Sequence, residues 1–493
     1  MGRRHSGSPH LVRSAGIHPV TDAVVIGSGP NGLAAAVRLA QAGLRVLVVE
    51  GADEIGGGTR SAELTVPGLL HDVCSAVHPF GAASPFLSSL PLADFGLHWR
   101  RAEVDVVHPL ADGSAGVLHQ SLEMTVLGMG ADGARWKSVF GPLVDRADAL
   151  VADGLGPLLR LPSHPLAMAR LGLRAGLPAT ALVRLFRTEG ARALFMGCAA
   201  HLYRPLNGLA SASVGTMMIA AGHRWGWPVA QGGSAAISRA LAGLLESLGG
   251  EIVTGVTVRS LNDVPRAAVT MFDTTPEAVT DITGDRMPAR RAKAYRQFRH
   301  APAAFKADFA VRGGIPWVNE HARRAGTVHL GGSAADIARS ESSISRGVMP
   351  ENSFQLIGQQ YLADPSRSVG DVHPVWTYAH VPHAYPGDAS ELLIGQIEEL
   401  APGFRDRIVA QHLTSPRQLQ DENPNYVGGD IVGGRNDLLQ VFARPVPARN
   451  GYATGIPGMY LCSASTPPGA GAHGMCGYHA ATSALEYLRG LKR

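Results

Sequence analysis

The chain of 493 residues contains only four cysteines, Cys74, Cys198, Cys462 and Cys476, and none of them forms a Cys-x-x-Cys pair. This spacing argues against a dithiol redox centre and a cysteine zinc site, and it suits a reducing compartment. No run of about 18 apolar residues occurs, so we expect no membrane-spanning helix. The formal net charge is only +4, and no aromatic-interleaved basic stripe is present, so we expect no nucleic-acid partner.

The first twenty residues are polar and basic, and they lack the apolar segment of an export signal. We therefore expect residues 1–20 to form a flexible tail and the protein to be cytoplasmic. Hydrophobic residues make up 45% and charged residues 17% of the chain, as in a well-packed globular protein. A chain of this length is too long to fold around a single small hydrophobic core, so two domains are expected.

A strand–turn–helix–strand pattern follows this tail. Residues 22–26 (DAVVI) have the apolar, β-branched character of a buried parallel strand, and residues 27–32 (GSGPNG) form a glycine-rich turn. Residues 33–42 carry alanine and leucine at helical spacing, and residues 45–49 predict a second strand with Glu50 at its end. The complete order of these parts predicts a dinucleotide-binding unit.

Each part of this unit has a physical task. Gly27 permits the tight turn, Gly29 lets the backbone approach a pyrophosphate, and Gly32 allows close packing of helix and strand. The N-terminus of the helix offers free N–H groups and a positive dipole end to the phosphates. Glu50 can accept hydrogen bonds from ribose hydroxyls and would repel a 2′-phosphate, which disfavours NADP in this site.

A second glycine cluster at residues 51–61 contains Gly57, Gly58 and Thr59. The residues alone allow either a flexible loop or a second approach of the backbone to the cofactor. The cluster resembles the glycine-pair motif of FAD enzymes in the amine oxidase and phytoene desaturase superfamily, where only glycines leave room beside the pyrophosphate and ribitol. This resemblance makes the three residues candidates for FAD binding, together with Pro30 and Asn31 of the first turn.

Two later segments are similar to the same superfamily. Residues 232–253 read as a helix followed by a strand, and the resemblance implies a backbone contact between Val258 and adenine. Residues 458–488 read as strand, loop and helix, with Ala464, Gly474 and Met475 as FAD-binding candidates. The N–H group of Met475 and the helix dipole would stabilise negative charge at N1–C2=O of a reduced flavin.

The loop before the last helix also matches the pattern GxGxxG at residues 469–474. We reject a second, nicotinamide-binding unit there because too little chain follows to supply the next strand and its ribose-binding acid. The C-terminal stretch closely resembles that of bacterial phytoene desaturases, and the resemblance to phytoene dehydrogenase-related NAD(P)/FAD-dependent oxidoreductases covers nearly the whole chain after residue 20. Ser463 and Ala464 depart from the Gly–acid pair of amine oxidases, which weakens an amine oxidase assignment.

We therefore predict an α/β fold with a discontinuous Rossmann-like FAD-binding domain and an inserted mixed α+β substrate domain. The segments assigned to the FAD-binding domain are residues 21–77, 227–276 and 420–493. The segments assigned to the substrate domain are residues 78–226 and 277–419, which contain short amphipathic helices and strand-like pieces.

The resemblance implies an FAD-dependent dehydrogenase or desaturase that transfers hydride between a hydrophobic, isoprenoid-like small molecule and flavin N5. His473 is the catalytic candidate because it lies in the loop before the last helix, although a structural role fits it equally well. His223 is a weaker candidate, since core packing explains it better. The elements at residues 428–430 and 444–445 either wall the site or form ordinary tight loops.

Leu-rich residues 155–192 carry six arginines against one glutamate. Such a stretch either contacts an anionic membrane surface peripherally or places solvated arginines on helices of the substrate domain. Two other functions remain open, an FAD-dependent amine or alcohol oxidase and a non-catalytic binding or escort protein on the same fold. The sequence does not identify the substrate, the electron acceptor or the oligomeric state.

Overall fold

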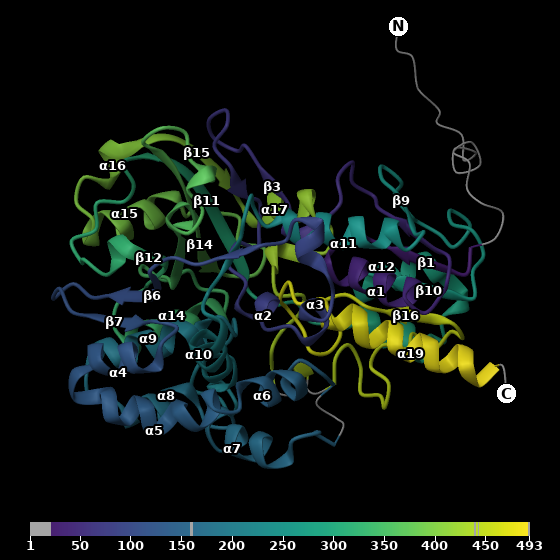
Figure 1. Ribbon diagram of the computed structural model, residues 1–493, viewed down its shortest axis with the longest axis horizontal. Coiled ribbons are helices and arrows are strands. Elements are labelled where there is room, and N and C mark those ends of the chain that lie inside the picture. Colours follow the sequence, from purple (N-terminus) through teal and green to yellow (C-terminus); the bar gives the residue numbers. More distant parts are fainter. Residues whose placement is uncertain (1–20, 158–160, 438–439, 442, 492–493) are drawn as a thin grey trace, which may run out of the picture.

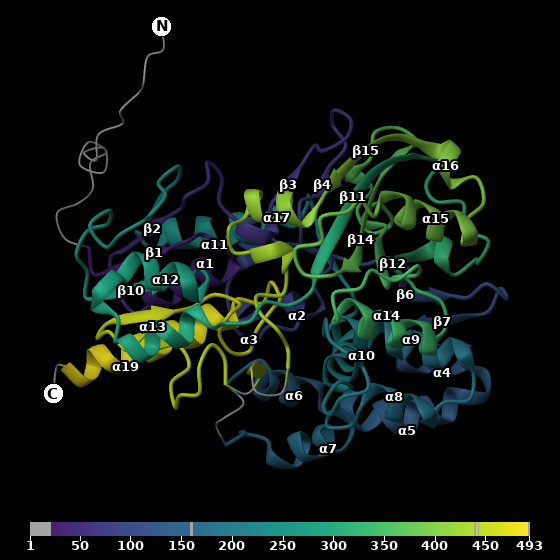
Figure 2. The ribbon, with the colours of Figure 1, turned by 180° about the vertical axis from the view of Figure 1, so that it is seen from behind.

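The computed structural model describes residues 21–157, 161–437, 440–441 and 443–491. The tail predicted for residues 1–20 therefore lies outside the described residues. Two sheets organise the rest of the chain, and Figure 1 shows one near each end of the molecule, with most of the α4–α10 helices packed below the larger sheet. Figure 2 shows the same layers from behind.

The smaller sheet has five strands in the order β16-β10-β1-β2-β9. All four pairings between neighbouring strands are parallel, and β1 lies in the centre. Its strands are β1 (Ala23–Ile26), β2 (Val46–Val49), β9 (Glu251–Val253), β10 (Val269–Phe272) and β16 (Met459–Leu461). Parallel strands buried on both faces require continuous apolar sequence, which explains the AVVI and VLVV runs of β1 and β2.

Helices cover both faces of this sheet. One face packs against α1 (Pro30–Ala40), α11 (Ala235–Ser247) and α19 (Met475–Leu491). The other face packs against α12 (Pro276–Thr283) and α13 (Ala289–Arg296). This arrangement places the N-terminus of α1 at the carboxyl end of β1, where a parallel α/β sheet binds its ligands.

The larger sheet has seven strands in the order β15-β11-β14-β13-β12-β6-β7. Its pairings are antiparallel except for the parallel pair of β6 and β12. The strands are β6 (Val104–Pro109), β7 (Ala115–Leu118), β11 (Ala303–Arg312), β12 (Ala325–Leu330), β13 (Gln355–Gly358), β14 (Val372–Val381) and β15 (Ile408–Thr414). Helix α15 (Ser390–Leu400) packs on one face of this sheet through its buried leucine and isoleucine side chains.

A helical layer covers the other face. It includes α5 (Gly133–Val144), α6 (Ala147–Gly154), α7 (Pro165–Ala175), α9 (Glu189–Ala200) and α10 (Ser213–Trp225). These helices share one apolar core with side chains of β6, β13 and β14. The functional cavity described below lies between this layer and the five-stranded sheet.

The structure confirms the predicted fold class, a mixed α/β fold with a parallel Rossmann-like sheet and a large second sheet. The strands of the parallel sheet come from the three segments that the sequence assigns to cofactor binding, and we propose the two-domain division on this basis. Among the described residues no single helix is long and apolar enough to cross a membrane. Within the described ranges, one bent pair, Pro165–Ala175 and Ala179–Leu185, meets the length and composition criteria when both helices are taken together.

Candidate cofactor and substrate site

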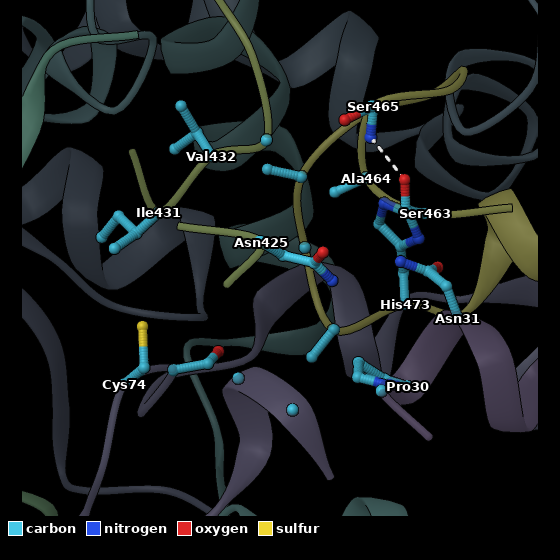
Figure 3. A pocket seen from close by; sticks show the side chains of 18 of the residues that line it. Pro30, Asn31, Cys74, Asn425, Ile431, Val432, Ser463, Ala464, Ser465 and His473 are labelled. Carbon is cyan, nitrogen blue, oxygen red and sulfur yellow. Dashed lines mark hydrogen bonds between the residues drawn. The ribbon is translucent and has the colours of Figure 1, made fainter. Parts of the chain in front are cut away.

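One cavity of about 1030 Å³ joins the glycine-rich turn to the apolar interior of the helical layer. Figure 3 shows it from close by, with Pro30 and Asn31 at the turn and Cys74 on another wall. Ile431 and Val432 project from a separate loop, and Ala464 lies on the C-terminal loop. The same space is therefore bounded by segments from the beginning, middle and end of the chain.

The first glycine turn brings backbone close to backbone. Gly27 has a φ of +99°, which favours glycine, and a Cβ there would lie 2.8 Å from the carbonyl oxygen of Asp273. A Cβ at Gly32 would lie 2.2 Å from the carbonyl oxygen of Gly27, so α1 could not begin this close to β1 with any other residue. Gly27 and Gly29 line the cavity, whereas Gly32 lies behind the turn.

Glu50 lies where the sequence places a ribose-binding acid. Its two carboxylate oxygens already accept hydrogen bonds from the Ser28 N–H at 2.7 Å, the Ser28 hydroxyl at 2.6 Å and the Ala52 N–H at 2.9 Å. A carboxylate offers about four lone pairs, so Glu50 retains acceptor capacity for a ligand hydroxyl. The same contacts fix the glycine turn to the end of β2.

The second glycine cluster lies against the first. A Cβ at Gly57 would lie 3.1 Å from the Cα atom of Gly29, and a Cβ at Gly58 would lie 2.1 Å from the hydroxyl oxygen of Tyr426. The Thr59 hydroxyl donates to the Gly56 carbonyl oxygen at 2.8 Å, which joins the two ends of the cluster. Gly57, Gly58 and Thr59 all line the cavity, and their local hydrogen bonding argues against the flexible-loop alternative.

The loop before α19 supplies His473, which is fully buried and lines the cavity. Its Nδ1 accepts a hydrogen bond from the Met475 N–H at 3.0 Å. Burial lowers the pKa of His473 to about 4, so the ring is neutral and carries its proton on Nε2. His473 can therefore donate a hydrogen bond from Nε2.

The remaining predicted residues divide into two groups. Val258 and Ala464 line the cavity. Gly474 and Met475 do not; a Cβ at Gly474 would lie 2.8 Å from the Cβ of Ala34, so this glycine allows α19 to approach α1. The Met475 N–H is used by His473 rather than left free.

Asp273 is a site residue that the sequence analysis missed. It follows β10, is buried, and its Oδ2 accepts a hydrogen bond from the Gly32 N–H at 2.9 Å. Burial, reinforced by the negative charge of Glu50, raises the pKa of Asp273 to about 7. An acid directly after a buried strand of a parallel sheet is the signal that could have identified it.

The rest of the cavity is mainly apolar. Its lining comes from the helical layer, from β13 and β14, and from the loop after the short helical turn Val427–Gly429, and it includes Met168, Leu171, Met217, Met218, Leu356, Trp376, Tyr378, Ile431 and Val432. Cys74 also lines this part, and burial raises the pKa of its thiol. All four cysteines are free and buried. An apolar lining of this extent suits an apolar small molecule.

The elements at residues 428–430 and 444–445 form hydrogen bonds with the loops that line the cavity but do not line it themselves. Asp430 accepts hydrogen bonds from the Val432 N–H at 2.8 Å and the Gly434 N–H at 2.7 Å. Arg444 donates to the carbonyl oxygens of Ala464 at 3.2 Å and Gly434 at 3.3 Å. Neither Asp430 nor Arg444 is part of the cavity lining.

His223 lies away from the cavity, in the core of the helical layer. Its Nε2 accepts a hydrogen bond from the Trp136 indole N–H at 3.1 Å, and burial lowers the pKa of His223 to about 4. These contacts indicate a structural role in joining α5 to α10.

The geometry fits a dinucleotide. Asn31 lines the cavity at the N-terminus of α1, and its buried Oδ1 has no hydrogen-bond partner among the described residues. His473 Nε2, on the loop before α19, likewise lacks one within this part of the chain. Buried polar atoms without partners are rare in native proteins, so a bound group that supplies their partners accounts for both.

Comparison with known proteins agrees with this geometry. The pattern of the NAD(P)-binding Rossmann-like domain family matches residues 25–89. The mouse pyridine nucleotide-disulfide oxidoreductase domain-containing protein 2 is 35% identical over 96 residues. That match spans 19% of this chain and 16% of the mouse protein, so it concerns a small part of both molecules.

Solved structures share the fold over nearly the whole chain. Putrescine oxidase bound to putrescine has a TM-score of 0.58 and 18% sequence identity, and the similarity covers 96% of this chain and 99% of that one. A fatty acid isomerase from P. acnes that produces CLA has a TM-score of 0.54 and 14% identity, with 95% and 99% covered. These similarities establish a fold shared with putrescine oxidase and with a fatty acid isomerase.

Proposed function

We propose that this protein is an FAD-dependent oxidoreductase of the phytoene dehydrogenase-like type that acts on an apolar, isoprenoid-like or lipid-like small molecule. The observation that carries the proposal is the single cavity, which joins a dinucleotide cradle to an apolar chamber. A cofactor and a substrate in this space would be in direct contact. Bound FAD would supply hydride transfer at N5, and the protein supplies binding, orientation and exclusion of water.

In this proposal the glycine turn and the N-terminus of α1 hold the pyrophosphate, and Glu50 accepts hydrogen bonds from the ribose. Gly57 and Gly58 leave room for the ribitol, and the backbone of Val258 faces the adenine. The assignment of FAD over NAD(P) rests on this second glycine cluster, which packs directly on the first. His473 acts as a neutral hydrogen-bond donor rather than as a base, because its Nδ1 lone pair is already used.

The first experiment is the visible absorption spectrum of the purified protein, before and after heat release of any chromophore. Released FAD supports the proposal and justifies anaerobic reduction of the flavin with apolar substrates. Peroxide release with small amines or alcohols would favour an oxidase instead. A colourless protein that cannot be reconstituted with FAD would contradict the proposal and favour the binding-protein alternative.

The Glu50→Ala variant tests the placement of the cofactor. Loss of hydrogen bonds to a charged acceptor should weaken FAD binding by about 1.5–3 kcal/mol. Glu50→Gln, which keeps one acceptor oxygen for the turn, should retain more flavin than Glu50→Ala. The exposed Glu246→Ala on α11 is the control. Equal flavin content and affinity in all variants would refute this site.

We also propose that α7 contacts an anionic membrane from which substrate is collected. Leu166 and Leu173 on α7 are 77% and 74% exposed, and Leu161 just before the helix is 94% exposed. Arg170 lies on the same exposed face as the two helical leucines. Other α7 residues, among them Leu171, line the cavity, so one helix would join the membrane surface to the substrate chamber.

A further inference from the structure

Three histidines from distant parts of the chain form a row beside the cavity; His108 and His329 are buried, and His201 is half-buried. His108 lies on β6 and His329 on β12. Thr327 and Val328 of β12 pair with Val106 and Val107 of β6, so the next residues, His329 and His108, are neighbours across the two strands. His201 follows α9, and its Nε2 lies 3.2 Å from the Nε2 of His329.

The contact of His108 with a carbonyl oxygen fixes its proton, and the protons of the other two histidines are assigned from it. A carbonyl oxygen only accepts hydrogen bonds, so His108 Nε2, which lies 2.9 Å from the Gly332 carbonyl oxygen, must carry the proton. Burial lowers the pKa of His108 to about 4, so the ring is neutral and its Nδ1 bears a lone pair.

The second contact to consider is that between His108 and His329, which lies beside Gly197. A Cβ at Gly197 would lie 2.7 Å from His329 Nδ1 and 3.2 Å from His108 Nδ1, so both nitrogen atoms lie beside this glycine. His108 Nδ1 and His329 Nδ1 have no hydrogen-bond partner among the described residues. A second lone pair beside that of His108 Nδ1 would be repelled, so we assign the proton of His329 to Nδ1 and its lone pair to Nε2. His201 must then donate from its own Nε2 to His329.

With the protons placed in this way, the Nδ1 of His201 carries a lone pair and can accept a hydrogen bond. His201 lines the cavity, and its only hydrogen bond within the described residues is the one to His329. Its ring makes edge contacts with Trp227 and Phe354, with centroids 5.8 Å away in both cases, which limits its rotation. Burial, with a smaller effect from His380, lowers the pKa of His201 to about 3, so the acceptor stays neutral at physiological pH.

We infer that His201 Nδ1 accepts a hydrogen bond from a hydroxyl group of the substrate, so the substrate is an apolar alcohol rather than a pure hydrocarbon. His201 is then a specificity-determining residue, and His329 and His108 are positioning residues that hold its tautomer. A neutral hydroxyl fits this wall better than an ammonium group, because an ammonium would be desolvated against neutral rings without a counter-charge from the row. The inference rests on the proposed function, since it concerns the same cavity.

Matched ligands with one C15 skeleton test this inference on the flavin-containing protein. Farnesol can donate a hydrogen bond, farnesyl methyl ether keeps the oxygen but cannot donate, and farnesene has no oxygen. We expect farnesol to bind about three- to tenfold more tightly than the ether, as measured by equilibrium dialysis. Equal binding of all three, or tightest binding of farnesylamine, would overturn the inference.

Two variants distinguish loss of the His201 acceptor from a general change in the packing of the cavity wall. His201→Phe keeps a ring in the wall but removes the acceptor, so the preference for farnesol over the ether should disappear. Gly197→Ala places a methyl group beside His329 and His108 and should reduce the same preference, although neither Gly197 nor His329 lines the cavity. Gly395→Ala on α15 is the matched control, because a Cβ there meets nothing within 4 Å.

An unchanged farnesol-to-ether ratio in His201→Phe would refute the role of this residue, even if affinity for all ligands falls together. Equilibrium dialysis does not depend on the flavin spectrum. Flavin content measured on the same sample therefore distinguishes failure of this inference from failure of the proposed function.

Discussion

At the scale of single residues, Asp273 has the most consequential environment in the cofactor cradle. Its carboxyl group is buried beside Glu50 and beneath the turn that would hold a pyrophosphate. A second negative charge at this place opposes both folding and the binding of an anionic ligand. The protonated form relieves this cost, because the hydrogen bond from the Gly32 N–H survives protonation.

This environment predicts a pH-dependent effect of Asp273→Asn on the stability of the cofactor-free protein. Because the folded pKa of about 7 exceeds the unfolded value of 3.8, Asp273 costs little stability below pH 4. As the pH rises from 4 to 7, the buried Asp273 carboxyl lowers the free energy of unfolding by an increasing amount, and above pH 7 this loss is constant. The variant should be more stable than wild type at pH 8, by at most about 4 kcal/mol.

Denaturant unfolding at several pH values between 5 and 8 measures this difference. The exposed Asp145→Asn provides the control, since it removes a carboxylate without removing a buried one. A stability difference for Asp273→Asn that does not change with pH would contradict the assignment.

The residues of the candidate site differ in how well the sequence predicts them. Gly27, Gly29 and Glu50 belong to a local pattern whose spacing follows from one strand–helix–strand unit, and they line the cavity together. The row of His108, His201 and His329 has no local signal. The pairing of β6 with β12 and the end of α9 bring these three together over long sequence separations, which no spacing rule describes.

At the scale of elements, the close contact between α1 and α19 fixes the two ends of the cofactor cradle. The sequence predicts both helices, at residues 33–42 and up to about 488, and the structure has α1 at Pro30–Ala40 and α19 at Met475–Leu491. Local apolar periodicity reveals a helix but not its neighbour. Their contact depends on Gly477, where a Cβ would lie 1.8 Å from the Asn31 carbonyl oxygen.

Gly477→Ala should therefore destabilise the protein by about 1–3 kcal/mol, because the methyl group forces the two helices apart. It should also lower FAD retention, since Asn31 and the turn move with α1. Gly490→Ala lies on the same helix with nothing within 4 Å, and we expect it to be neutral or slightly stabilising. Thermal unfolding and flavin content test both variants, and similar behaviour of the two would argue against the packing role of Gly477.

At the scale of the whole molecule, exposed leucines and arginines on α7 lie on the outer side of the substrate chamber. We expect the protein to sediment with vesicles that contain phosphatidylglycerol, and less so at high salt, because screening weakens the arginine contribution. The double variant Leu166→Glu with Leu173→Glu should reduce the bound fraction at least about tenfold, since it removes two membrane-buried leucines.

Leu127→Glu on α4 is the matched control, because Leu127 is equally exposed, at 76%, on a different helix. A similar loss of vesicle binding in this variant would indicate a general charge effect. Binding to vesicles of neutral phosphatidylcholine alone, unaffected by salt, would refute the contribution of the arginines.

The order of strands in the parallel sheet has a consequence for how the chain is synthesised. β1 pairs with β10, which is formed about 240 residues later, and β10 pairs with β16 near the C-terminus. During translation the edge of β1 that pairs with β10 therefore stays unpaired until β10 emerges from the ribosome. The other edge of β10 then stays unpaired until β16 emerges. The cofactor cradle, which needs α19 as well as α1, can be completed only after nearly the whole chain has been made.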